Sequence, residues 1–92
     1  MPRYAIIYKI NNKDLIFHNG ALTIEDAEVY ISKEEAEKVK SKIVEDCQKI
    51  LKDKREKQNS AEENIKDIYE KAIKENELIL STIKIEKIDY ED

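Results

Sequence analysis

The stretch that decides the fold is AEVYISKEEA, residues 27–36, where a short apolar strand pattern meets a long charged helical pattern. Ser32 stands at the junction, and its hydroxyl can accept a hydrogen bond from an amide of the first helical turn. Glu35 follows three residues later and can reach back to the amide of Ser32, which is the capping-box arrangement. We therefore expect a helix to begin directly after Ser32.

Toward the N-terminus, the sequence shows the alternation of β-strands. Tyrosine and isoleucine alternate over residues 3–10, and this period of two is typical of a strand. Residues 11–14 predict a turn that returns the chain as a hairpin, and Asn19-Gly20 favours a second tight turn. Whether residues 21–24 add a further short strand is left open. The expected strands are residues 3–10, 15–18, 28–31 and 78–88.

On the C-terminal side, apolar residues recur at steps of three and four, which predicts helix. This apolar stripe lapses between Leu51 and Ile65. Ser60 and Glu63 repeat the capping-box spacing, so we favour two helices joined as a hairpin. No proline interrupts residues 33–77, which leaves one continuous helix as the alternative. The expected helices are residues 33–57 and 61–76.

Together these elements predict an α+β fold. A mostly antiparallel sheet of three to five strands would carry the two-helix hairpin on one face. Ninety-two residues suit a single domain, residues 1–92. A 25-residue helix spans about 37 Å against about 27 Å for an eight-residue strand, so residues 52–64 should extend beyond the sheet by roughly 10 Å.

The chain carries little of the chemistry that catalysis or metal binding requires. It has one histidine, His18, and one cysteine, Cys47, which falls on the apolar stripe of the first helix, where a buried thiol is unreactive. Glu25, Asp26 and Glu28 could hold a divalent ion only loosely, and we interpret them as a solvated loop. One glycine excludes a glycine-rich phosphate-binding loop. We expect no enzyme activity, no metal site and no cofactor.

The charge balance and the cysteine count limit the class of protein further. Charged residues make up 41% of the chain, yet the net charge is −4, which is not the strongly basic balance of a dedicated nucleic-acid binder. One cysteine excludes an internal disulfide, so nothing indicates secretion. No signal peptide or membrane-length apolar run is present, and we expect a cytoplasmic protein.

Three groups of side chains are candidates for binding another protein. Tyrosines on the strands would be exposed on a sheet face that the helices leave uncovered, although they also suit core packing. Basic residues at the end of the first helix suit an acidic partner or nucleic acid, or simply complement the helix dipole. Acidic residues of the second helix form a solvated face or imitate phosphate charges. The candidate protein-binding residues are Tyr4, Tyr8, Tyr30, Lys52, Lys54, Arg55, Glu62 and Glu63.

The segment VYISKEEAEKV, residues 29–39, resembles the strand-to-helix segment of many small proteins encoded by phages and prophages. Such accessory proteins include anti-CRISPR proteins and other inhibitors of bacterial defence. The resemblance implies a viral, protein-binding inhibitor that acts in the host cytoplasm on a nuclease or another nucleic-acid-handling defence protein. It transfers no functional residue. The alternatives are a small nucleic-acid-binding regulator that uses the basic end of the first helix, and a structural homodimer.

Overall fold

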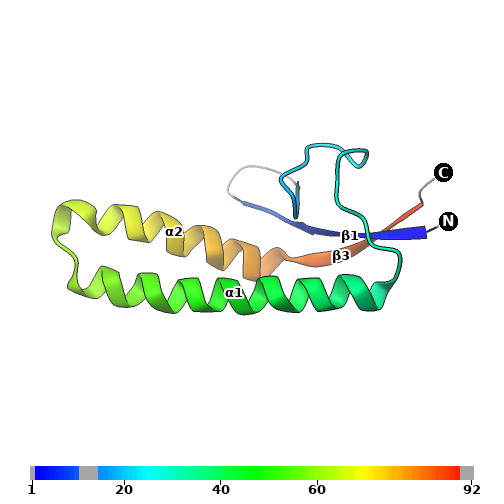
Figure 1. The fold of residues 1–92 in the computed structure, drawn as a ribbon. Helices are drawn as coiled ribbons and strands as arrows, with labels where there is room; N and C mark the ends of the chain where they lie inside the picture. Colours follow the sequence, from blue (N-terminus) through cyan, green and yellow to red (C-terminus); the bar gives the residue numbers. More distant parts are fainter. Residues whose placement is uncertain (1, 11–14, 90–92) are drawn as a thin grey trace.

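A three-stranded antiparallel sheet and two long helices form the α+β fold of this chain (Figure 1). The computed structural model describes residues 2–10 and 15–89, so the turn expected at residues 11–14 lies outside the described residues. The elements follow one another as β1 (Pro2–Tyr8), β2 (Ile16–Phe17), α1 (Lys33–Ser60), α2 (Glu63–Thr82) and β3 (Lys84–Asp89). The expected α+β class is confirmed. The structure has the two separate helices that the sequence favoured, and the alternative of one continuous helix is wrong.

β1 is the central strand, with β2 on one side and β3 on the other. Ile6 of β1 pairs with Ile85 of β3 in antiparallel register. Ala5, Ile6 and Ile7 are all buried, although successive side chains of a strand point to opposite faces. Both faces of β1 are therefore covered, by α1 on one side and by the segment 18–32 on the other (Figure 1).

The segment between β2 and α1 contains less strand than expected. Residues 21–24 form bends and turns, after a turn in which Gly20 has a φ of 77°. The strand expected at residues 28–31 is reduced to one bridge. In it the amide of Tyr30 donates to the carbonyl of Tyr4 at 2.7 Å, and the carbonyl of Tyr30 accepts the reverse bond at 2.9 Å. The expectation was wrong because the chain only crosses the edge of β1 there on its way to α1 (Figure 1).

α1 begins where the local sequence predicts. The amide of Glu35 donates a hydrogen bond to the hydroxyl of Ser32 at 3.2 Å, and Ser32 itself has extended backbone angles. A side-chain cap of this kind contributes about 1 kcal/mol. Glu34 and Glu35 also place negative charge at the positive end of the helix dipole. Local chemistry is thus sufficient to set the start of α1.

The second capping box, at Ser60 and Glu63, does not form. α1 continues as far as Ser60, whose hydroxyl donates to the carbonyls of Glu56 and Lys57 at 3.4 Å. Glu62 takes the N-cap position of α2, with no side-chain cap bond. The expectation was wrong because a serine hydroxyl can also bond back to carbonyls of its own helix, which removes it as a cap for the next one.

The end of α2 is a second correction. Residues 78–82 are helical, and β3 begins at Lys84 instead of residue 78. Their sequence, LILST, favours a strand on propensity alone. The helix forms because α2 packs against α1. In its last turn the hydroxyl of Thr82 donates to the carbonyl of Leu78 at 2.6 Å. Tertiary packing therefore overrides the local preference.

The hairpin projects much further from the sheet than the sequence suggests. The amide of Lys9 donates to the hydroxyl of Thr82 at 2.9 Å, which fixes the end of α2 at the end of β1. A single residue, Ile83, then joins α2 to β3, so α2 cannot fold back across the sheet. The first half of α1 lies along the sheet, and its second half pairs with α2 beyond it (Figure 1). We call this projecting part, residues 48–81, the arm.

The length of the arm changes the shape of the molecule. The 20 residues of α2 span about 30 Å, where an overhang of roughly 10 Å was expected. The expectation that both helices cover one sheet face therefore holds for α1, whereas α2 reaches the sheet at the end of β1. The molecule measures 53 × 24 × 16 Å.

The hydrophobic core is small and lies mainly at the sheet end. Within the described part of the chain, α2 contributes one buried side chain, Ile73, and the part of α1 that belongs to the arm contributes Leu51. Neither α1 nor α2 has a stretch apolar enough to cross a lipid bilayer. The buried apolar residues are Ala5, Ile6, Ile7, Ala36, Cys47, Leu51, Ile73 and Ile88.

Candidate functional site

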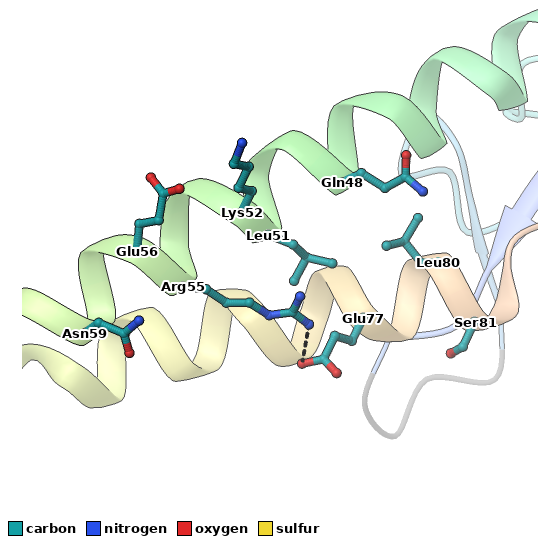
Figure 2. Close-up of a pocket in the computed structure, with 9 residues that line it drawn as sticks. All are labelled: Gln48, Leu51, Lys52, Arg55, Glu56, Asn59, Glu77, Leu80 and Ser81. Atoms are coloured by element: carbon teal, nitrogen blue, oxygen red, sulfur yellow. Dashed lines mark ion pairs between the residues drawn. The ribbon is translucent and has the colours of Figure 1, made fainter.

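A shallow groove, open to solvent and about 700 Å³ in volume, runs between the two helices of the arm. α1 lines one side with residues that recur at steps of three and four, and α2 supplies the other side (Figure 2). The groove is a candidate contact surface because it lies on the part of the molecule that projects from the sheet. Its lining residues are Gln48, Leu51, Lys52, Arg55, Glu56, Asn59, Glu77, Leu80 and Ser81.

The groove has an apolar floor and a charged rim. Leu51 and Leu80 point toward each other from the two helices (Figure 2), and Lys52 lies at the outer edge of the groove. The guanidinium of Arg55 forms an ion pair with the carboxylate of Glu77 at 3.9 Å, and both side chains are about half exposed. An exposed pair of this kind contributes at most about 1 kcal/mol, so a partner can displace it at little cost.

The far end of the arm is tied together by polar contacts between the helices. The side-chain amide of Gln58 donates to the carboxylate of Glu70 at 2.7 Å and to the carbonyl of Lys66 at 3.4 Å. The ammonium of Lys54 lies 5.9 Å from the ring centre of Tyr69, which is cation–π distance. These contacts join α1 to α2 where apolar burial is sparse.

The basic residues expected at the end of α1 are mostly paired with acids. Ion pairs of 3.1–3.9 Å join Lys49 to Glu45, Lys54 and Lys57 to Asp53, and Arg55 to Glu77. Among the ion pairs of the described residues, none involves Lys52. The cluster therefore presents mixed charge, which attracts the phosphate backbone of a nucleic acid much less than an unpaired basic surface would.

The two acidic candidates lie at the tip of the arm. Glu62 and Glu63 are exposed at the start of α2, and the side chain of Glu63 is 93% exposed. The carboxylate of Glu63 pairs with Lys66 at 3.7 Å. Both acids also lie at the positive end of the helix dipole, which stabilises α2.

The three tyrosines lie at the sheet end of the molecule, away from the tip of the arm. Tyr4, Tyr8 and Tyr30 are all half-buried. Burial raises the pKa of the Tyr8 phenol above its ordinary value of 10.0. Burial, together with the neighbouring carboxylate of Glu28, which accepts a 3.3 Å hydrogen bond from Tyr30, raises the pKa of Tyr30 as well. Because the three tyrosines lie at the sheet end, the structure does not bring them into one site with the charged candidates of the arm.

The histidine and the cysteine occupy different settings. His18 lies 3.8 Å from the carboxylate of Glu28, next to β2. Cys47 is a free, buried thiol on α1. Burial, and to a lesser extent the charge of Asp46, raises the pKa of Cys47 above its ordinary value of 9.0 and keeps the thiol protonated at neutral pH.

The acidic loop is held by its own hydrogen bonds. The carboxylate of Asp26 accepts a 3.1 Å hydrogen bond from the hydroxyl of Thr23, and the carbonyl of Asp26 accepts one of 2.8 Å from the side-chain amide of Asn19. Within residues 2–10 and 15–89, no three His, Cys, Asp or Glu side chains form a group that could hold a metal ion.

Sequence reasoning missed the groove as a unit. Of its lining residues it singled out Lys52 and Arg55, on the basis of charge. The spacing of residues 48, 51, 52, 55 and 59 along one helical face was a signal that could have revealed the α1 wall. The α2 wall could not be found in this way because residues 78–82 were expected to form a strand.

Comparison with known proteins found no match among protein-family models, curated proteins or solved structures. The class of the molecule is therefore defined by its own architecture. It is an α+β protein whose three-stranded antiparallel sheet carries a projecting helical hairpin.

Proposed function

We propose that this chain is a non-enzymatic binding protein that contacts another protein through the groove side of its arm. The groove carries the proposal because it combines an apolar floor at Leu51 and Leu80 with a polar rim. Protein interfaces have this same organisation, with an apolar centre that is surrounded by polar contacts. The groove also lies on the part of the molecule that projects from the sheet (Figure 1).

The contacts between the two helices of the arm support the proposal. The contacts of Gln58 with Glu70 and of Lys54 with Tyr69 hold the two helices together before any partner binds. Binding to a preformed surface costs less conformational entropy than binding that must first order the surface. An arm of this kind is therefore suited to a stable, specific contact.

The charge of the groove supports a protein as the partner. Lys52 and Arg55 stand on its rim beside Glu56 and Glu77, so a partner must match both signs of charge. The resemblance of residues 29–39 to phage accessory proteins narrows the proposed partner to a host nuclease or another defence protein. The alternative is that the basic end of α1 binds nucleic acid, and a pull-down with and without nuclease separates the two.

Reversing two charges on the groove rim is expected to abolish partner binding. The variant Lys52→Glu with Arg55→Glu places two carboxylates beside Glu56 and Glu77, so a partner that matches the native rim meets repulsion instead. We expect the wild-type chain to retain one stoichiometric protein from nuclease-treated host lysate. The double variant should lose at least about 90% of it, a tenfold change that corresponds to about 1.4 kcal/mol. Pull-down with quantitative mass spectrometry measures this.

The matched control is Lys38→Glu with Lys87→Glu, which reverses two exposed lysines outside the arm and changes the net charge equally. It should retain the partner fully. Equal loss in both double variants would contradict the groove as the binding surface. Recovery of nucleic acid alone, when nuclease is omitted, would favour the nucleic-acid alternative.

A further inference from the structure

A second surface of the arm is apolar and only partly covered by the described chain, which leaves Ile65 and Ile68 exposed and Ala72 and Ile79 half-buried. Four apolar residues of α2 recur at steps of three, four and seven, which places them on one side of the helix. They are Ile65, Ile68, Ala72 and Ile79. Ile68 is 68% exposed and Ile65 is 38% exposed. Isoleucines at this spacing are typical of a helix that packs against two neighbours, and α1 accounts for one of them.

We propose that two copies of this chain associate through the Ile65–Ile79 stripe, so that their arms form an antiparallel four-helix assembly about a two-fold axis. A second copy fits this surface because a two-fold contact requires the same patch on both partners. The small side chain of Ala72 near the middle of the stripe allows the two α2 helices to approach closely.

The exposed surface of the chain is large enough for such a contact. The accessible surface is 6668 Å², whereas a monomer of 10.8 kDa is expected to expose about 5,500 Å². The radius of gyration of 15.5 Å likewise exceeds the roughly 12 Å expected for a chain of this length. The excess area, about 1,100 Å², is comparable to the roughly 800 Å² that each partner buries in a standard interface.

Charges beside the stripe match under the same two-fold arrangement. Among the described residues, no ion pair involves Lys71 or Glu75. A two-fold axis near the height of residue 73 sets Ile68 of one copy opposite Ile79 of the other and brings Lys71 close to Glu75 of the second copy. Each dimer would then contain two such pairs.

This contact does not use the groove. Helical residues follow one another at about 100°, so Glu77 of the groove and Ile79 of the stripe point to roughly opposite sides of α2. A dimer would therefore leave both grooves open. The inference is independent of the proposed function, and either can fail without the other.

Light scattering coupled to gel filtration tests the inference on the full chain at about 100 µM, a hundredfold above a micromolar Kd. We expect the wild-type chain to elute with twice the mass of 10.8 kDa. Ile68→Lys should elute as a monomer with an unchanged circular dichroism spectrum, because Ile68 is exposed within one copy. Leu22→Lys, at an 85% exposed position outside the arm, is the matched control and should remain dimeric.

A charge exchange tests the arrangement itself. Lys71→Glu and Glu75→Lys should each weaken the dimer at least about tenfold, and the double exchange should restore it, because the two charges then meet again with signs reversed. A monomeric wild-type chain would overturn the inference. A dimer that survives Ile68→Lys would also overturn it, as would equal loss with Leu22→Lys.

Discussion

Replacing Ile6 with alanine is expected to lower the free energy of unfolding by about 2–5 kcal/mol. Ile6 lies in the central strand β1 and is 0% exposed, so the change leaves a cavity between the sheet and its covering layers. A chain of 92 residues has a total stability of about 5–14 kcal/mol, so the loss is a large share of it. Urea denaturation followed by circular dichroism measures the change.

The matched control is Ile31→Ala, which removes the same atoms from a side chain that is 74% exposed. It should change the free energy of unfolding by no more than about 0.5 kcal/mol. Similar losses in the two variants would contradict the placement of β1 at the centre of the core.

Replacing Ile73 with aspartate is expected to open the arm. Ile73 is 5% exposed on α2, and a carboxylate there would be buried without a partner, which costs several kcal/mol. Because α2 reaches the sheet at its C-terminal end, the damage should concentrate in the arm. Hydrogen exchange should accelerate more strongly for amides of residues 63–81 than for those of β1.

The control for this second substitution is Lys74→Asp, which introduces the same group one residue later. The side chain of Lys74 is 70% exposed, and its ion pair with Glu70 spans 3.9 Å. Exchange in the arm should therefore change little. Equal acceleration in β1 and in the arm of Ile73→Asp would contradict the prediction, because it would show that the two parts open together.

Features that depend on neighbouring residues were predictable from the sequence. The cap at Ser32 requires an amide three residues away, and the start of α1 follows from it. The alternation in β1 likewise indicated a strand, because a period of two reflects the local geometry of the backbone. Asn19-Gly20 indicated a turn, and Gly20 adopts the positive φ that such turns use.

Features that depend on distant parts of the chain were not predictable in the same way. Residues 78–82 have the composition of a strand and become helical because they pack against α1. As a result, β3 begins later than expected, α2 extends away from the sheet, and the two helices form the arm. The groove then combines Leu51 with Leu80, 29 positions apart in the sequence, and no local pattern links those two residues. The prediction at Ser60 failed for a different reason. The local sequence matched a capping box, but the hydroxyl of Ser60 bonds to carbonyls of α1 instead of capping α2.

The central claim is that the groove side of the arm binds another protein. Hydrogen exchange of the chain alone and in complex with the protein retained in the pull-down tests this claim most directly. We predict slower exchange for amides at residues 48–59 and 77–81 in the complex, with little change in β1. Protection confined to the strands that carry Tyr4, Tyr8 and Tyr30, with none in the arm, would contradict the claim.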